Sequence, residues 1–342
     1  MNILKKRRGR LFFAITLIFA LTGCATLFQN AALPQPISVS GFKLNTYVEI
    51  KGYDRACTME LLQNALALCD KYEHMFSRTD KDSILSELNQ NHTAVVPEEL
   101  GELIEYGITY GSLSGGSFDI SIGAVSSLWD FTAAAPVPPD RDAVSKAAAS
   151  VNYADINIKK NQDKTYTVVL PEDMILDLGA IAKGYIADKI KEYLIENGVK
   201  SALINLGGNV LCVGDRPGNG SYIISVRLPF GEASEYLCRL AVSDMSVVSS
   251  GTYERCFTYD GTFYHHMLDP RTGYPYDNGL SQVTVISKDS VTGDCLSTSC
   301  FTLGLDEGLK LIENTAGVEA IFVTKDNVTH LSSGAEQFLY NR

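Results

Sequence analysis

Residues 176–188, Leu-Asp-Leu-Gly-Ala-Ile-Ala-Lys-Gly-Tyr-Ile-Ala-Asp, constrain the fold of this chain most strongly. A short apolar run that carries Asp177 stops at Gly179, and apolar residues then recur at helical spacing as far as Leu194. The pattern predicts a strand, a tight turn and a helix that ends at Gly198.

The start of this predicted helix is a candidate site for an anion. A helix start presents unpaired N–H groups and the positive end of the helix dipole, and Lys183 adds a positive charge in the first turns. A phosphate or pyrophosphate would suit such a site. An ordinary strand-to-helix turn, with a lysine that extends into solvent, explains the same residues equally well.

Helices and strands mix along the chain without a regular βα alternation. The predicted helices cover residues 53–76, 82–89, 97–113, 140–149 (with Asp140 as N-cap), 182–198, 294–303 and 306–314. The predicted strands cover residues 41–51, 166–170, 201–206, 222–228, 236–242, 263–268, 280–287 and 319–324. This order predicts an α+β fold, with antiparallel or mixed sheets and flanking helices.

The N-terminus has the composition of an export signal. Five basic residues within positions 5–10 precede an apolar run at 11–21, and Leu-Thr-Gly-Cys follows at 21–24. This ending resembles a bacterial lipobox, so we expect a lipoprotein signal peptide at 1–23, a lipidated Cys24, a tether at 24–40 and a folded domain at 41–342. The protein would then be extracytoplasmic and anchored in the membrane. An uncleaved N-terminal anchor is the alternative.

Charge and cysteine content argue against several classes of protein. Loss of the five positive charges of residues 1–23 takes the formal net charge from −11 to −16, which disfavours nucleic-acid binding and favours the recruitment of cations. Seven further cysteines contain no Cys-x-x-Cys pair, which argues against a zinc site and a disulfide framework. We expect most of them to be small buried hydrophobic residues.

Two further motifs have both a plain and a functional interpretation. Gly207-Gly208 follows a predicted strand, where it forms either a simple hairpin turn or a place where a ligand approaches the backbone. His265 and His266 fall on one predicted strand, so only one of them can face a common site. A strand histidine can also serve packing alone.

Asp294 and Thr298 are four residues apart on a predicted helix and therefore share a face. A carboxylate and a hydroxyl suit Mg²⁺, which takes few protein ligands and completes its shell with water and phosphate oxygens. Asp294 could instead be only an N-cap, and the spacing does not decide between these interpretations.

Taken together, six blocks in this order resemble the ApbE family. They are Ser-Gly-Gly-Ser-Phe-Asp at 114–119, residues 176–184, Asn-Leu-Gly-Gly-Asn at 205–209, Ser-Gly at 250–251, His-x-x-Asp-Pro-Arg-Thr-Gly at 266–273 and Asp-x-x-x-Thr at 294–298. The resemblance extends from about residue 42 to the end of the chain. It implies an FAD:protein FMN transferase, an extracytoplasmic enzyme that moves FMN from FAD to a threonine or serine of a partner protein.

The resemblance also implies roles for individual residues. The metal ion, Mg²⁺, would be held by the carbonyl of Ala180 and the side chains of Asp294 and Thr298, and His266 would be the candidate base. The residues expected to contact FAD are Leu44, Thr79, Ser117, Phe118, Asp119, Asp177, Lys183 and Leu268.

The chain departs from the family pattern at two of these positions. Leu44-Asn45-Thr46 stands where the family usually has Met-Gly-Thr, and Thr79 stands where it often has Tyr, so an aromatic stacking surface is absent. The expected partners are flavoprotein subunits of electron-transfer systems outside the cytoplasm. Hydrolysis of FAD to FMN and AMP, or flavin binding without catalysis, are the alternative functions.

Overall fold

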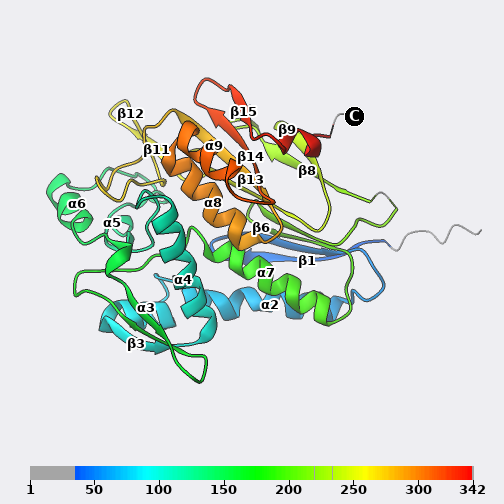
Figure 1. Ribbon diagram of the computed structural model, residues 1–342, viewed down its shortest axis with the longest axis horizontal. Helices are drawn as coiled ribbons and strands as arrows, with labels where there is room; N and C mark the ends of the chain where they lie inside the picture. Colours follow the sequence, from blue (N-terminus) through cyan, green and yellow to red (C-terminus); the bar gives the residue numbers. More distant parts are fainter. Residues whose placement is uncertain (1–34, 219, 233, 341–342) are drawn as a thin grey trace, which may run out of the picture. The chain divides into compact units, whose positions relative to one another are not determined.

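A computed structural model of the chain describes residues 35–218, 220–232 and 234–340 (Figure 1). The predicted signal peptide, Cys24 and most of the predicted tether lie outside these residues. Among the helices that are described, none is both long and apolar enough to span a bilayer. The compact body of the chain begins at Pro36.

The main sheet has eight strands in the order β1-β2-β6-β7-β10-β13-β14-β15, and all neighbours are antiparallel. All eight residues of β13 are buried, as expected for a central strand. The strands are β1 (Ile37–Lys43), β2 (Thr46–Gly52), β6 (Ala202–Leu206), β7 (Asn209–Val213), β10 (Ser246–Gly251), β13 (Leu280–Ser287), β14 (Glu319–Thr324) and β15 (Thr329–Leu331).

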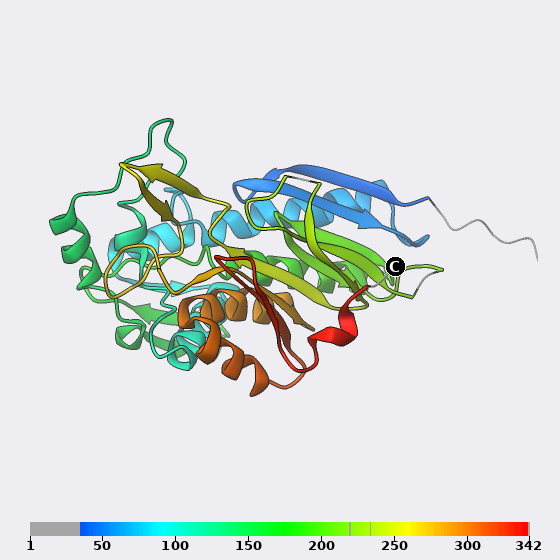
Figure 2. The ribbon, with the colours of Figure 1, turned by 90° about the horizontal axis from the view of Figure 1, so that it is seen from above.

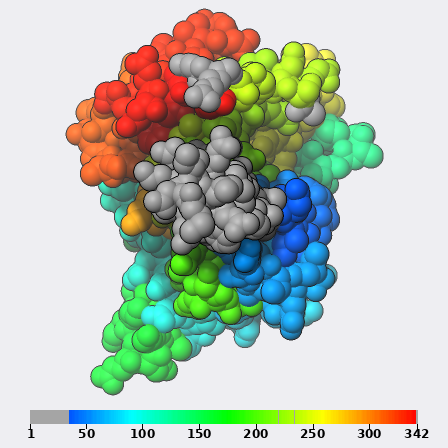
Figure 3. Space-filling model, turned by 90° about the vertical axis from the view of Figure 1, so that its right-hand side faces the viewer, coloured from blue at the N-terminus to red at the C-terminus, as the bar shows by residue number. Residues whose placement is uncertain are grey.

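Helices cover one face of this sheet and a β-hairpin covers part of the other. The helices are α2 (Met59–Phe76), α7 (Ala182–Glu196), α8 (Ser290–Leu303) and α9 (Leu305–Glu313). The hairpin consists of β8 (Tyr222–Arg227) and β9 (Tyr236–Val242), beside the short helix η2 (Ala335–Phe338) (Figure 3). Along β7, Leu211 and Val213 belong to the core under the helices, whereas Cys212 belongs to the core under the hairpin.

The remaining elements form smaller units beside the main sheet. Strands β3, β5 and β4 form a three-stranded sheet, and β11 pairs with β12 next to the loop that follows α5 (Figure 2). These elements are α3 (Ile84–Asn91), β3 (Thr93–Val96), α4 (Glu98–Leu113), α5 (Gly123–Ser126), α6 (Arg141–Ala148), η1 (Tyr153–Asp155), β4 (Asn157–Lys160), β5 (Tyr166–Val169), β11 (Cys256–Tyr259) and β12 (Thr262–His265). The predicted α+β fold with antiparallel sheets and flanking helices is confirmed.

The strand predicted at 41–51 is in fact a hairpin. β1 and β2 are joined by Leu44 and Asn45, whose φ angles are 54° and 56°. Asn tolerates the left-handed region well, so this two-residue turn forms without glycine. β1 begins at Ile37, so residues 37–40, at the end of the predicted tether, belong to the sheet.

The segment 176–178 is also not a regular strand. It is held by isolated bonds, with Asp177 N donating to Ile120 O at 2.7 Å and Leu176 N donating to Asn89 Oδ1 at 2.8 Å. The helix that follows, α7, ends just before Gly198, which has a φ of 83° as a helix-ending glycine should. Other local predictions hold, including the cap at Asp140, which accepts hydrogen bonds from two backbone N–H groups.

The seven cysteines of the described body are all free thiols, and five of them are buried. The expectation that most are small buried hydrophobic residues is confirmed.

Candidate active site

A single cavity of about 1350 Å³ collects every site residue expected from the sequence. The twelve residues come from several parts of the chain, and they line its wall together with other polar and aromatic side chains. They are Leu44, Thr79, Ser117, Phe118, Asp119, Asp177, Ala180, Lys183, His266, Leu268, Asp294 and Thr298.

The turn that precedes α7 is fixed by the carboxyl group of Asp177. One oxygen accepts a hydrogen bond from Gly179 N at 3.0 Å, and the other accepts from Arg78 Nε at 3.1 Å and Ser126 Oγ at 2.7 Å. Asp177 lines the cavity and thus ties three separate segments together at its wall. Both of its oxygens are already engaged by the chain itself.

The start of α7 packs directly on α8 because Gly184 has no side chain. A Cβ atom at this position would lie 2.5 Å from the carbonyl oxygen of Ser290 and 2.7 Å from the Cβ of Asp294. One turn further along α7, the carboxyl group of Asp188 accepts the N–H groups of Ser290 and Val291, both at 2.8 Å. A residue of α7 therefore caps α8, whose own N-cap residue, Asp289, makes no side-chain capping bond.

This packing changes the hydrogen bonding at the start of α7. Gly184 N donates to Asp294 Oδ2 at 2.8 Å, and it makes no hydrogen bond with Ala180 O, its usual partner four residues earlier. The carbonyl oxygen of Ala180, which lines the cavity, therefore does not accept the hydrogen bond that a regular helix would give it. Lys183 lines the same part of the wall.

Asp294 is not an N-cap, which excludes one of the two interpretations of the sequence. α8 begins at Ser290, so Asp294 lies in the second turn, and only 4% of its surface is exposed. Burial raises the pKa of Asp294, while Lys183 and the Gly184 N–H oppose this shift. Thr298, one turn later, lines the cavity as well, and its hydroxyl lies 3.2 Å from Ser250 Oγ.

The donors at this place suit a hard cation. The Ala180 carbonyl, the Asp294 carboxyl group and the Thr298 hydroxyl are all oxygen donors, and Mg²⁺ needs only one or two carboxylates from the protein. No group of three or more His, Cys, Asp or Glu side chains able to hold a metal ion occurs in the described part of the chain. The residues present therefore fit magnesium better than a zinc-type site.

His266 lies just beyond the end of β12 and not on the strand, which corrects the prediction that both histidines are strand residues. Its backbone N–H donates to Arg255 O at 3.1 Å, and its Nδ1 atom is buried without a partner. Burial, with contributions from the charge of Arg255 and Lys183, lowers the pKa of His266 to about 3. The imidazole is therefore neutral at physiological pH.

His265, by contrast, has a structural role. Its Nε2 atom lies 3.0 Å from Tyr276 O, and its Nδ1 atom accepts a hydrogen bond from Met267 N at 3.3 Å. These two contacts require the neutral tautomer with the proton on Nε2. The prediction that only one of the two histidines faces a common site is confirmed, because His266 lines the cavity and His265 does not.

The segment 117–119 contributes to the cavity in a different way. The Asp119 carboxyl group already accepts hydrogen bonds from Ser121 N, Ser121 Oγ and Tyr153 N at 2.7–2.8 Å. Ser117 pairs with the hydroxyl of Thr302 at 3.0 Å, and its carbonyl accepts the Tyr276 hydroxyl at 2.8 Å. These bonds hold the segment in a fixed shape, with Phe118 between the two polar residues.

The remaining three predicted residues lie on different elements of the wall. Leu44 is at the tip of the β1–β2 turn, where its N–H donates to Glu73 Oε2 at 3.2 Å. Thr79 follows α2, and its N–H donates to Ser77 Oγ at 3.2 Å. Leu268 is buried in an aromatic cluster around Trp129.

Several cavity residues had no role assigned from the sequence. Arg78 binds Asp177, the Trp129 and Phe131 rings stack with centroids 5.4 Å apart, and Asn209 follows the Gly207-Gly208 turn. The sequence offered a signal for each of them. Arg78 directly precedes Thr79, Trp129 is the only tryptophan of the chain, and Asn209 is the last residue of the Asn-Leu-Gly-Gly-Asn motif.

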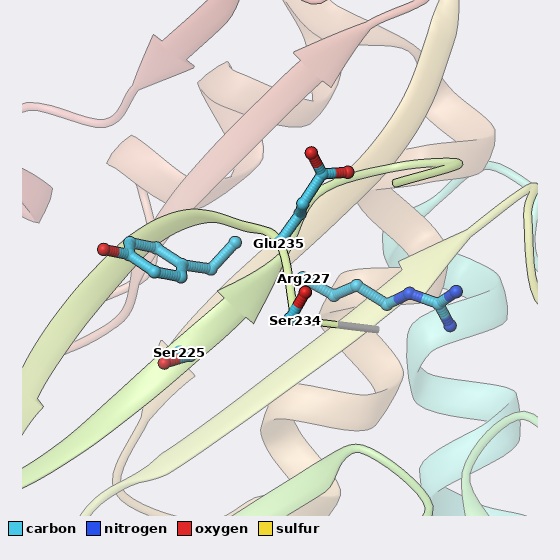
Figure 4. Close-up of a pocket in the computed structure, with 5 residues that line it drawn as sticks. Ser225, Arg227, Ser234 and Glu235 are labelled. Atoms are coloured by element: carbon cyan, nitrogen blue, oxygen red, sulfur yellow. The ribbon is translucent and has the colours of Figure 1, made fainter. Parts of the chain in front are cut away.

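A smaller cavity of about 320 Å³ lies against β8 and the start of β9 (Figure 4). Arg227 lines both cavities, and its guanidinium carbon lies 5.3 Å from the centre of the Tyr253 ring.

Fold and cavity together define an α+β protein with a large cavity of mixed polar and aromatic lining. The model of the ApbE family matches residues 44–322, and this chain belongs to that family. It is 35% identical to the FAD:protein FMN transferase of Klebsiella pneumoniae (strain 342), over 84% of this chain and 88% of that protein. It is 32% identical to the FAD:protein FMN transferase of Treponema pallidum (strain Nichols), over 85% of each chain.

Solved structures give the same assignment. The crystal structure of the ApbE protein of Thermotoga maritima matches 90% of this chain and 100% of its own, with a TM-score of 0.81 and 28% identity. The flavin transferase ApbE of Vibrio cholerae matches 89% of this chain and 99% of its own, with a TM-score of 0.76 and 25% identity. The resemblance to the ApbE family is thus confirmed.

Proposed function

We propose that this protein transfers FMN from FAD to a threonine or serine of a partner flavoprotein and releases AMP. The observation that carries the proposal is the convergence of all twelve expected residues on one cavity. Its volume of about 1350 Å³ exceeds the roughly 300–1000 Å³ of common small-molecule pockets, so it has room for a dinucleotide. The names of the relatives in Klebsiella pneumoniae and Treponema pallidum support the same reaction.

The pyrophosphate of FAD would bind at the start of α7. Lys183 supplies a positive charge there, and the positive end of the helix dipole adds to it. Ala180, Asp294 and Thr298 would hold Mg²⁺ beside it. When bound, this ion neutralises charge that develops on the phosphate oxygens and on the leaving group.

In the reaction, the hydroxyl oxygen of the acceptor forms a bond to the phosphorus of the FMN part of FAD. The bond from that phosphorus to the bridging oxygen breaks, and AMP leaves with this oxygen. His266 takes the hydroxyl proton, because its imidazole is neutral and lines the cavity. An anionic substrate would also raise the low pKa of this histidine, which makes it a better base in the complex.

The test is mass spectrometry of a candidate acceptor protein after incubation with this protein, FAD and Mg²⁺. A mass increase equal to bound FMN, located on a threonine or serine, supports the proposal. AMP with free FMN and an unmodified acceptor would indicate hydrolysis instead. Absence of AMP under all conditions would indicate a protein that binds flavin without catalysing a reaction.

We further propose that the mature protein is an extracytoplasmic lipoprotein and that its acceptors are subunits of electron-transfer systems. The support is the basic and apolar N-terminal pattern with Cys24 at its end. Cys24→Ser is expected to move the protein from the membrane fraction to the soluble fraction. If fractionation finds the variant still bound to the membrane, a different anchor is present.

A further inference from the structure

We propose that Asn209 is a positioning residue that holds the carboxyl group of Asp294 in the orientation required to bind the metal ion. This inference rests on the proposed metal site, and it assigns a role to a residue for which neither the sequence nor the family resemblance suggested one.

The position of Asn209 is fixed by its backbone. It is the first residue of β7 and pairs with Leu206 across the Gly207-Gly208 turn, in which both glycines have positive φ angles of 65° and 94°. Such a turn holds the two strand ends rigidly, so the Asn209 side chain leaves the sheet at a defined place beside the cavity. Only 3% of its surface is exposed.

The orientation of the amide group is fixed by two serines. Ser290 Oγ donates to Asn209 Oδ1 at 2.6 Å, and Ser246 Oγ donates in turn to Ser290 Oγ at 3.1 Å. All three residues are buried, so water does not compete for these bonds. Because Oδ1 faces Ser290, the NH₂ group of Asn209 must point the other way.

This NH₂ group faces the part of α8 that carries Asp294. Ser290 and Asp294 are four residues apart and lie on the same face of the helix, and Asn209 and Asp294 both line the cavity, so the amide that binds Ser290 lies on the side of α8 that carries Asp294. The Nδ2 atom is buried and has no hydrogen-bond partner within the described residues. A buried N–H donor without a partner is costly, which favours a role that is completed only in the loaded site.

The Asp294 carboxyl group has one partner that the backbone fixes. Gly184 N occupies one carboxyl oxygen at 2.8 Å. An amide on a second side would prevent rotation of the carboxyl group and keep an oxygen directed at the ion, as partners of metal ligands commonly do.

The experiment compares the wild type with Asn209→Ala and Ser290→Ala. Two quantities are measured: the Mg²⁺ concentration that gives half-maximal AMP release from FAD, and the binding of Mn²⁺ alone, followed by electron paramagnetic resonance. Loss of a residue that orients a metal ligand commonly weakens metal binding by about 10- to 100-fold. We expect such a shift in both quantities for Asn209→Ala, a smaller shift for Ser290→Ala, and recovery of the turnover rate at saturating Mg²⁺.

Asp294→Ala serves as the reference for loss of the metal site itself. A wild type that needs no Mg²⁺ and binds no Mn²⁺ would contradict the proposed metal site. Unchanged metal affinities in Asn209→Ala, with a weaker affinity for FAD, would show that this amide binds the nucleotide and would overturn the inference. A lower thermal midpoint with unchanged metal affinities would reduce Asn209 to a structural role and overturn it as well.

Discussion

The polar side chains of the cavity differ in how many hydrogen bonds they make to other groups of the protein. The carboxyl groups of Asp119 and Asp177 each accept three hydrogen bonds from protein groups, so these residues shape the wall. His266 has a buried Nδ1 atom without a partner, and only one oxygen of Asp294 accepts a bond from the backbone. Residues with unused bonding capacity are those that can still change partners during a reaction.

The His266→Ala variant tests the assigned base at this scale. Loss of a general base typically lowers the rate by about 10²- to 10⁴-fold, and we expect FMN transfer to fall by that amount while the affinity for FAD is kept. Stopped-flow or discontinuous assays of transfer and calorimetry with FAD measure the two quantities separately. The control is His330→Ala, a histidine on β15. A normal rate of FMN transfer in His266→Ala would mean that another group takes the proton.

The family resemblance supplied the expected members of the site, but neither it nor the spacing of residues indicated the bonds among them. The four-residue spacing placed Asp294 and Thr298 on one helix face, and both line the cavity. The bond from Gly184 N to Asp294 joins residues 110 positions apart, so no local pattern reveals it. The role of Asp188 as the cap of α8 was hidden for the same reason.

At the scale of elements, the contact between α7 and α8 sets the geometry of the site. Gly184→Ala would place a methyl group 2.5 Å from Ser290 O and 2.7 Å from Asp294 Cβ, which forces the helices apart. We expect a loss of about 1–3 kcal/mol in the free energy of unfolding, measured by urea denaturation. Gly41→Ala is the matched control, because its new Cβ meets no atom closer than 3.8 Å, and an equal loss in both variants would contradict this account of the contact.

The end of β12 provides a prediction about pH. Burial lowers the pKa of His265 to about 4, whereas an unfolded histidine has a pKa near 6.5. Between these values the unfolded chain binds a proton that the folded chain does not, so stability is lost as the pH falls from about 6.5 to 4. The full contribution of this group is roughly 3 kcal/mol.

His265→Gln removes this titration and keeps a donor for the Tyr276 carbonyl. The difference in the free energy of unfolding between wild type and variant is expected to change with pH only between about 4 and 6.5. Chemical denaturation at a series of pH values measures it, with His330→Gln as the control for a partly exposed histidine. A difference that does not vary with pH would show that His265 does not titrate in this range.

Element prediction succeeded where local signals were strong. The 3.6-residue period and the terminal glycine located α7, and Asp140 marked the start of α6. The β1–β2 turn was missed because Leu44 and Asn45 adopt positive φ angles without a glycine to mark them. Segment 176–178 looked like a strand, because its apolar residues are buried as in a strand while its hydrogen bonds go to isolated partners.

At the scale of the whole molecule, the site depends on strand order. Residues near positions 44, 79, 118, 180, 266 and 294 meet because β2 pairs with β6 and β7 pairs with β10, across long stretches of sequence. Pairings between distant strands leave no trace in local composition, so their order could not be predicted from periodicity. The family resemblance supplied what periodicity could not, since it implied that the separated motifs share one site.

In the proposed reaction, bound FAD is split by transfer of FMN to a protein hydroxyl. The most direct measurement is the ratio of AMP released to FMN covalently attached, in a reaction that contains this protein, FAD, Mg²⁺ and an acceptor flavoprotein subunit. The proposal predicts one AMP for each flavinylated threonine or serine, and no transfer when Mg²⁺ is chelated. AMP released in excess together with free FMN, while the acceptor stays unmodified, would contradict it and identify water as the acceptor.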